Sequence, residues 1–246
     1  MVSIITPAYN ADKFIKFSIE SVLMQSYQDW EMIIIDDCST DDTIKIVKSY
    51  HDIRIKLIVS DTKLFTAGAR NLGIMKAQGN YIAFLDSDDF WHRDKLQKQI
   101  SLMFNSKAFF AYTGVNKINN KGKELGNISV PESLKYNNLL RGNKICCSSV
   151  IIDIKAIKDL KFNIHYVIHE DYALWLKIFR SGSINAVGIN EPLTFYRVHN
   201  DGKTNNKLMV LKWAWKIFRE SEEFSFTKSS ISFFFYAIEG LKKYIV

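Results

Sequence analysis

The amino-acid sequence predicts an α/β fold with a mostly parallel central sheet, helices on both faces and further helices at the C-terminus. In the first half of the chain, continuous apolar runs alternate with segments of helical period, as in parallel strands buried on both faces. The length of 246 residues and the hydrophobic content of 47% suit one large domain, or a domain with a tail. Polar clusters follow three of the apolar runs, at Tyr9-Asn10, Asp36-Asp37 and Asp86-Ser87-Asp88-Asp89.

The first elements are predicted to alternate between strand and helix. VSIITPAYN (2–10) is an apolar run broken by Thr-Pro, which indicates a strand and then a turn. ADKFIKFSIESVLMQSY (11–27) repeats its apolar residues at helical spacing, so we expect an amphipathic helix. WEMIIIDDCSTDDT (30–43) combines a second buried strand with polar residues that can cap a helix over IKIVKSY (44–50).

The remaining elements follow from the same patterns. IRIKLIVS (53–60) alternates like a half-buried strand, TAGARNLGIMKAQG (66–79) is a helix closed by glycine, and YIAFLD (81–86) is the fourth strand. The second half is less regular, and its predicted elements are a helix at 94–104, a strand at 109–118, a turn at 119–122, a strand at 146–153, a helix at 169–182, a strand at 191–200 and a helical region from 206 onward.

Carboxylates are crowded where the fourth strand ends, in FLDSDD (84–89). Bare carboxylates at this spacing repel one another, so a cation usually accompanies them. A divalent ion that bridges carboxylates and a substrate diphosphate is the economical explanation, with Mg²⁺ or Mn²⁺ as candidates. The alternative is an exposed acidic turn that caps the following helix. The position beyond the carboxyl end of a buried strand favours a ligand site.

Five segments together resemble family 2 glycosyltransferases, which have the GT-A fold. They are VSIITPAYN, IIIDDCSTDDT, AGARNLG, FLDSDD and HEDYALWLKI, and they occur in the family's usual order. The resemblance is strongest to bacterial enzymes that build teichuronic acid, capsule or O-antigen polysaccharide. It implies a GT-A catalytic domain over 1–205, with a nucleotide-binding half (1–105) and an acceptor-binding half (106–205), followed by a basic, aromatic, helical C-terminal region over 206–246.

This resemblance also implies a donor site for a nucleotide sugar, with a UDP-sugar favoured. Asp37 would accept a hydrogen bond from the uracil imide, and Arg70 would donate to the base or the diphosphate. Tyr9 would stack on uracil. The nucleoside pocket as a whole would be lined by Thr6, Pro7, Tyr9 and Asn10.

The metal site implied by the resemblance is the DxD element. Asp88 would bind Mn²⁺ or Mg²⁺, and Asp86 would reach the ribose or the metal, with Asp89 as an alternative ligand. A loop after the last strand would close over the diphosphate, where His199 would touch the metal unless it is a structural histidine. Either of two basic residues of this loop would neutralise phosphate, Arg197 or Lys203.

The pair Glu170-Asp171 resembles the family's catalytic acids. Asp171 would be the general base that removes a proton from the acceptor hydroxyl, so that a single displacement inverts the anomeric carbon. The alternative is that both are first-turn acids favoured by the helix dipole, and both interpretations can hold together. Trp175, one turn later, is either a core residue or an acceptor platform.

The C-terminal region combines basic residues with Trp and Phe over 207–220 and 231–246. Such a pattern fits docking on an anionic membrane surface, and the alternatives are packing on the catalytic domain or a dimer contact. The implied acceptor is a saccharide linked to a polyprenyl diphosphate. No segment reaches the length of a spanning helix, no secretory signal is visible, and three cysteines form no disulfide framework. We therefore expect a cytoplasmic protein, peripheral at the inner face of the plasma membrane.

Rival functions remain at this stage. The net charge of +7 could serve phosphorylated substrates or anionic lipid, and no nucleic-acid motif accompanies it. A dehydrogenase is disfavoured because no G-x-G-x-x-G follows a strand. A sugar-phosphate nucleotidyltransferase would usually carry a glycine-rich loop where this chain has TPAYN. A non-catalytic nucleotide-binding module stays open as an alternative.

Overall fold

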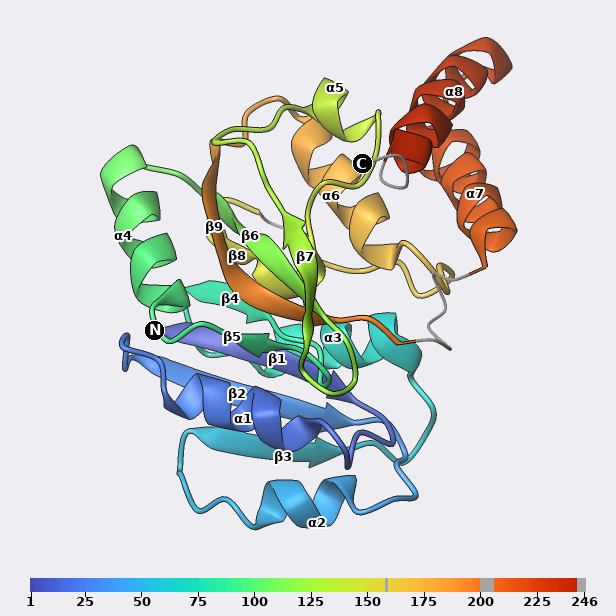
Figure 1. The fold of residues 1–246 in the computed structure, drawn as a ribbon. Helices are drawn as coiled ribbons and strands as arrows, with labels where there is room; N and C mark the ends of the chain where they lie inside the picture. The colour runs from blue at the N-terminus through green and yellow to red at the C-terminus, as the bar shows by residue number, and fades with distance from the viewer. Residues whose placement is uncertain (158, 200–205, 243–246) are drawn as a thin grey trace.

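The computed structural model describes residues 1–157, 159–199 and 206–242. Within these residues, nine strands form one sheet in the order β3-β2-β1-β4-β8-β6-β9-β5, and β7 pairs with β6 (Figure 1). The first four members are parallel to one another, and β6 is parallel to β9. Strand β8 lies between β4 and β6 and is antiparallel to both. The predicted α/β class with a mostly parallel sheet is confirmed.

The first half builds the parallel part of the sheet. Its strands are β1 (Val2–Ala8), β2 (Trp30–Asp36), β3 (Ile55–Val59) and β4 (Tyr81–Phe84). Its helices are α1 (Ile15–Leu23), α2 (Thr43–Lys48), α3 (Phe65–Lys76) and α4 (Lys95–Ser106). Ala8 is paired with Asp36, and Ile5 with Phe84, so the residues that follow these strands emerge at one edge of the sheet.

The second half adds antiparallel and helical elements. They are β5 (Phe90–Trp91), β6 (Phe110–Ile118), β7 (Glu124–Ile128), α5 (Tyr136–Leu139), a 3₁₀ turn η1 (Cys147–Ser149), β8 (Ile151–Asp153), α6 (Glu170–Arg180) and β9 (Ala186–Arg197). The C-terminal helices are α7 (Lys207–Lys216), the π-helical η3 (Ile217–Ser221) and α8 (Phe226–Lys242).

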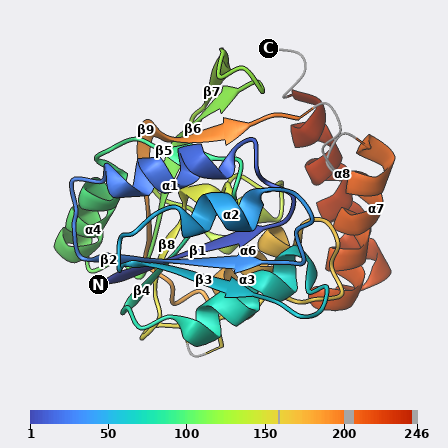
Figure 2. The same cartoon turned by 90° about the horizontal axis from the view of Figure 1, so that it is seen from below.

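Apolar side chains alternate between two cores because successive residues of a strand point to opposite faces. Ile4 belongs to the core under α1 and α4, whereas Ile5 belongs to the core that α3 and α6 cover (Figure 2). Trp175 on α6 is fully buried in the second core, with its ring 5.2 Å from that of Phe110. It is therefore a core residue and not an acceptor platform.

Some expected elements differ from the observed ones. The strand expected at 146–153 is shortened to β8, because residues 147–149 form a 3₁₀ turn. The last strand begins at Ala186, five residues earlier than the expected 191, since it pairs with β6 along its length. The short elements β5, β7 and α5 have no counterpart in the prediction.

The C-terminal helices pack on the second core at the edge of the molecule (Figure 1). Phe218 and Tyr236 are buried in this core, and Trp215 packs edge-on against Phe233 at 5.6 Å between ring centroids. One of the expected alternatives was that these helices pack on the rest of the domain, and one of their faces does so. No helix in the described part of the chain is long and apolar enough to cross a membrane.

Candidate active site

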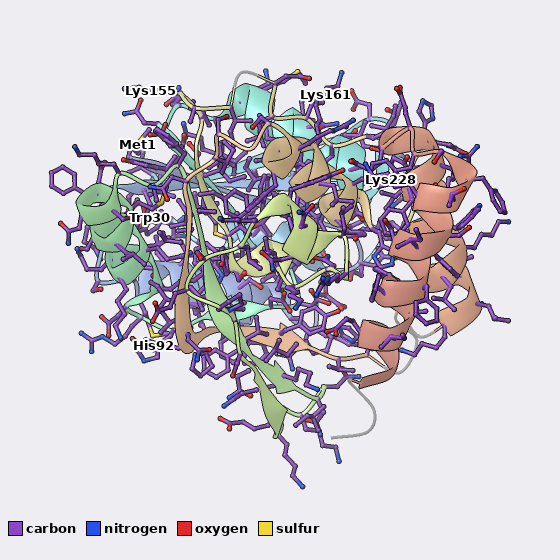
Figure 3. The ribbon with its side chains drawn as sticks, turned by 90° about the horizontal axis from the view of Figure 1, so that it is seen from above. Met1, Trp30, His92, Lys155, Lys161 and Lys228 are labelled. Atoms are coloured by element: carbon purple, nitrogen blue, oxygen red, sulfur yellow. The ribbon has the colours of Figure 1, made fainter. Side chains whose placement is uncertain are left out.

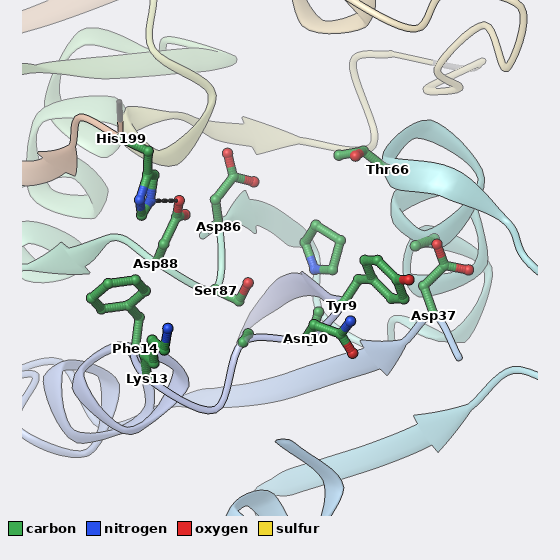
Figure 4. A pocket seen from close by; sticks show the side chains of 14 residues that line it. Tyr9, Asn10, Lys13, Phe14, Asp37, Thr66, Asp86, Ser87, Asp88 and His199 are labelled. Carbon is green, nitrogen blue, oxygen red and sulfur yellow. Dashed lines mark hydrogen bonds and ion pairs between the residues drawn. The ribbon is translucent and has the colours of Figure 1, made fainter. Parts of the chain in front are cut away.

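A pocket of about 530 Å³ lies where β1, β2 and β4 end (Figure 4). Its walls come from the loops after these strands, from α3 and from His199, which follows β9. Seven of the predicted site residues line it. The full lining is Pro7, Ala8, Tyr9, Asn10, Ala11, Lys13, Phe14, Asp37, Thr66, Ala69, Asp86, Ser87, Asp88 and His199.

One end of the pocket is built by Tyr9 and Asp37. The Asp37 carboxylate is nearly buried and accepts hydrogen bonds from the backbone N–H groups of Leu64 at 2.5 Å and Phe65 at 3.0 Å. The ammonium of Lys63 forms an ion pair with Asp37 at 3.2 Å and also lies over the half-exposed ring of Tyr9. Asp37 is thus held rigidly, and Tyr9 offers an aromatic face beside a cation.

Asn10 joins two loops of the pocket wall. Its side-chain oxygen accepts from the backbone N–H of Thr40 at 2.8 Å, and its own N–H donates to Ser39 Oγ at 2.9 Å. Asn10 adopts φ of 48°, a left-handed conformation that Asn tolerates better than most residues. Pro7 lines the pocket, whereas the side chain of Thr6 is fully buried and does not reach the wall.

The other end of the pocket carries Asp88 and His199. The Asp88 Oδ2 lies 2.7 Å from His199 Nε2, and the imidazole packs on Phe14 with ring centroids 5.3 Å apart. Asp86 stands on the same loop, and its Oδ1 accepts from Arg70 Nη2 at 2.7 Å. Figure 4 shows Asp86 beside the pair of Asp88 and His199.

Asp89 does not share this position. It is fully buried, and its carboxylate accepts from Ser148 Oγ at 2.6 Å and from the Arg197 backbone N–H at 2.9 Å. Burial, together with the charges of Asp88 and Asp86, raises its pKa well above the usual range. The structure therefore directs Asp89 toward the end of β9 and away from the pocket.

Arg197, one of the two residues expected to neutralise phosphate, is also placed differently. Arg197 is buried; its Nε donates to the Asp88 carbonyl at 2.9 Å and its Nη1 to the Asn119 carbonyl at 2.9 Å. Its guanidinium lies 4.4 Å from the ring centroid of Phe14. Arg197 thus fixes the loop that carries Asp88, and it does not line the pocket. Lys203 lies outside the described residues.

Arg70 connects the two groups of acids. Its side chain is 3% exposed, and its second terminal nitrogen donates to Glu170 Oε1 at 2.8 Å. Although burial works against the charged form, the carboxylates of Asp86 and Glu170 hold the pKa of Arg70 well above its usual value. A guanidinium is suited to this bridge because its planar fork presents several donors at once. Arg70 is therefore occupied within the protein, rather than open to the pocket.

Asp171 stands beside Glu170 at the start of α6. Its Oδ2 accepts from Asn143 Nδ2 at 3.2 Å, and its Oδ1 accepts from the Tyr172 backbone N–H at 2.7 Å. Burial raises the pKa of Asp171, while the positive charge of Arg70 lowers it. Burial also raises the pKa of Glu170. Desolvated carboxylates with raised pKa values are suited to accept a proton.

Several residues of the site were not predicted. Lys13, Phe14, Thr66 and Ser87 line the pocket, and Asn143 contacts Asp171. Ser87 lies within the acidic cluster, and Lys13 and Phe14 follow Asn10 closely, so position after a strand end was a usable signal for these three. Asn143 lies in a segment without periodicity, and no sequence pattern pointed to it.

The chain is similar to known proteins in sequence and in fold. The family model described as Glycosyl transferase family 2 matches residues 3–160. The Bacillus subtilis (strain 168) protein TuaG, assigned as a teichuronic acid biosynthesis glycosyltransferase, is 40% identical over 99% of this chain and 97% of its own. The Escherichia coli UDP-Glc:alpha-D-GlcNAc-diphosphoundecaprenol beta-1,3-glucosyltransferase WfgD is 36% identical over 99% and 95%. The structure of S. aureus TarS 1–349 in complex with UDP superimposes with a TM-score of 0.72 at 18% identity, over 96% of this chain and 70% of that one.

Proposed function

The chain belongs to glycosyl transferase family 2, and from this membership we propose an inverting, metal-dependent transfer of sugar from a UDP-sugar to a hydroxyl of a lipid-linked saccharide. As a family member it is a glycosyltransferase, and its named relatives serve the synthesis of bacterial polysaccharides. The GT-A fold predicted from the resemblance agrees with its structural neighbours. The donor, the metal and the stereochemistry are the parts that we propose.

One observation carries the proposal. A single pocket has an aromatic ring and a fixed carboxylate at one end, Tyr9 and Asp37, and the acid–imidazole pair of Asp88 and His199 at the other. This order suits a nucleoside diphosphate, with the base against Tyr9 and the phosphates near Asp88. Asp37 retains acceptor capacity for an imide N–H, because an ionised carboxylate offers about four lone-pair sites. We propose uracil as the base, with Thr6 supporting the wall from beneath and Pro7 and Asn10 shaping it.

The side chains near Asp88 have the chemistry of a divalent-metal site. Asp88 and His199 are in direct contact, Asp86 lines the same pocket, and carboxylates are suited to Mg²⁺ and Mn²⁺. Among the described residues, no group of three or more His, Cys, Asp or Glu side chains could hold a metal by itself. This fits an ion shared with substrate phosphates, which is how Mg²⁺ is usually held. We assign Asp88 as the main ligand with Asp86 and His199 beside it; when bound, the ion would neutralise charge on the leaving diphosphate.

The residues of this chain then divide the work of transfer. Asp171 accepts the proton of the acceptor hydroxyl, whose oxygen forms the new bond to the anomeric carbon. The bond from that carbon to the diphosphate oxygen breaks, and its electron pair leaves with UDP. Asn143 holds Asp171 in place, and Glu170 binds the Arg70 guanidinium. Attack opposite to the leaving group inverts the anomeric configuration.

The acceptor and the location are further parts of the proposal. The acceptor in the name of WfgD is N-acetylglucosamine on diphosphoundecaprenol. We propose that this chain likewise uses a saccharide on a polyprenyl diphosphate and works at the inner face of the plasma membrane. We assign residues 1–105 to donor binding, 106–205 to acceptor binding and 206–246 to the membrane side. The pocket supports this division, because most of its lining precedes residue 105, whereas Asp171 and Asn143 follow it.

A donor screen tests the proposal. The melting temperature of the full chain is measured with UDP-, GDP- and dTDP-sugars, each with and without Mn²⁺, because a ligand that binds the folded state stabilises it. We expect the largest increase with a UDP-sugar and Mn²⁺ together, accompanied by slow release of UDP. Equal shifts for all nucleotides would contradict the UDP assignment. Binding of a nucleotide sugar without release of UDP, and without transfer of sugar to any acceptor, would support a non-catalytic module instead.

A further inference from the structure

The loop of residues 141–144 lies between the candidate base and the C-terminal helix. Asn143 Nδ2 donates to Asp171 Oδ2 at 3.2 Å. Gly142 adopts φ of 151°, and a Cβ added there would stand 3.7 Å from the Cβ of Glu239 on α8. The Lys144 ammonium lies 4.0 Å from Glu239 Oε2. One short loop therefore touches Asp171 on one side and α8 on the other.

The same loop carries two exposed basic side chains. Arg141 is exposed, and its guanidinium lies 5.4 Å from the ring centroid of Phe235 on α8. The side chain of Lys144 is 39% exposed despite its contact with Glu239. Arg141 and Asn143 are two residues apart, which corresponds to at most about 7 Å along the chain. The patch of Arg141 and Lys144, counted together with the Glu239 carboxylate, thus leaves a net positive charge beside the site where Asp171 would receive an acceptor.

The outer face of α8 is apolar beside this patch. Ile231, Phe234 and Phe235 are 55%, 60% and 42% exposed, and their spacing of three and four residues places them on one side of the helix. We call these three residues the α8 stripe. Ser229, Ser232 and Tyr236 are buried on the side toward the domain, so the stripe faces away from the core, and Phe235 contacts Arg141 at its border. Figure 3 shows α8, marked by Lys228, at the rim of the molecule.

Aromatic side chains next to cations are suited to the boundary between lipid and water, where rings enter the interface and charges meet phosphates. Arg is also the side chain whose donor fork best matches phosphate oxygens. A second copy of the chain would have to bring matching acids to the patch, although the chain has a net charge of +7. The charge and the apolar stripe together therefore favour an anionic lipid over self-association.

We propose that Arg141, Lys144 and the α8 stripe bind the lipid diphosphate of the acceptor at the bilayer surface. This proposal rests on the proposed function. The α8 stripe enters the interface, and Arg141 and Lys144 hold the diphosphate. The sugar attached to that diphosphate then lies next to Asn143 and Asp171, with its hydroxyl turned toward the base. The C-terminal helix is in this way part of the acceptor site.

Vesicle sedimentation of the full chain tests the assignment. Three compositions are compared: phosphatidylcholine alone, phosphatidylcholine with phosphatidylglycerol, and phosphatidylcholine with undecaprenyl diphosphate at the same total charge. We expect the tightest binding to the diphosphate vesicles. The double variant Arg141→Gln with Lys144→Gln should lose about 25-fold in that affinity, at about five-fold for each charge. Phe234→Ser with Phe235→Ser should weaken binding to all three compositions.

Matched controls make the result decisive. Lys45→Gln with Lys48→Gln removes two charges from α2, on the far side of the sheet from α8 in Figure 1, and should bind diphosphate vesicles like the wild type. Unchanged binding by the Arg141/Lys144 variant at a wild-type melting temperature would overturn the proposal. Equal wild-type affinity for the two charged compositions would also overturn it, since the patch would then sense charge alone.

Two further outcomes are separable. A wild-type dimer in light scattering that becomes monomeric on Phe234→Ser with Phe235→Ser would overturn the proposal in favour of a second copy on the stripe. Titration of UDP in the absence of vesicles reports on the donor pocket independently. Vesicle binding without UDP binding would remove the proposed donor chemistry while supporting the lipid site, and the reverse result would remove only the lipid site.

Discussion

Arg70 and Glu170, one hundred positions apart in the chain, are joined by a buried ion pair with 2.8 Å between Nη1 and Oε1. The other terminal nitrogen of the same guanidinium reaches Asp86, on the loop that also carries Asp88. One side chain therefore ties the candidate metal loop to the start of α6. This bridge links the start of α6, where Asp171 lies, to Asp86 on the pocket wall.

The bridge predicts a strong effect of Arg70→Lys. A lysine keeps the charge but cannot donate in two fixed directions, so one of the two carboxylates loses its partner in a buried site. Removing one partner of a buried pair typically costs about 3–5 kcal/mol. We expect up to that loss in the free energy of unfolding in urea, together with slower transfer. Arg93→Lys, in an exposed pair with Asp94, should cost less than about 1 kcal/mol. Equal losses for both variants would contradict the bridging role.

The charge of Arg70 also predicts a shift in the pH dependence of transfer. Burial raises the pKa of Asp171 and of Glu170, and Arg70 lowers both. A base must be deprotonated to act, so activity should rise with pH through the raised pKa of this pair. In Arg70→Met the lowering charge is lost, both pKa values rise further, and the profile should move to higher pH. A profile that stays in place, measured on the residual activity, would contradict the electrostatic coupling.

Asp171→Asn is expected to separate binding from chemistry. The amide keeps the shape of the side chain but cannot take a proton, so transfer should fall by about 10²–10⁴-fold, the range that general bases supply. The affinity for UDP should stay close to that of the wild type. Asp159→Asn, which changes an exposed acid paired with Lys177, serves as the control and should transfer normally. Near-normal turnover by Asp171→Asn would remove Asp171 from the role of base.

Tyr9→Ala tests the nucleoside end of the pocket. Stacking of a base on an aromatic ring is worth about 1–3 kcal/mol, so the affinity for UDP should fall by about 5- to 150-fold in calorimetry. Tyr9→Phe keeps the ring and should retain most of the affinity. Lys63, which lies over this ring, must share it with the base or move aside. Equal affinities for Tyr9→Ala and the wild type would displace Tyr9 from the base site.

Long, periodic elements could be predicted from the sequence because a buried strand or amphipathic helix repeats its signal. The strands β1 to β4 and the helix α6 are of this kind. The two-residue β5 and the four-residue α5 are too short to repeat any pattern. The start of β9 was missed because Gly188 and Asn190 interrupt the strand pattern, while pairing with β6 supplies the structure.

The site, too, was predictable only in part. Position after a strand end located Tyr9, Asp37 and Asp88 on the pocket wall, because the topology of a parallel sheet brings such positions together. The direction of a side chain was not predictable in this way. Asp89 follows Asp88 directly but is turned toward Ser148, and Arg70 is turned toward Glu170, since contacts distant in sequence decide both.

The most direct test of the central claim is calorimetric titration of UDP into the full chain with and without Mn²⁺, for the wild type and for Asp88→Ala. The claim is that one pocket holds a nucleoside diphosphate together with a divalent ion. We expect Mn²⁺ to tighten UDP binding by the wild type and to have no effect on Asp88→Ala. The control Asp42→Ala, which changes an acid outside the pocket at the start of α2, should respond to Mn²⁺ like the wild type. Wild-type affinity for UDP that is the same with and without Mn²⁺ would contradict the account.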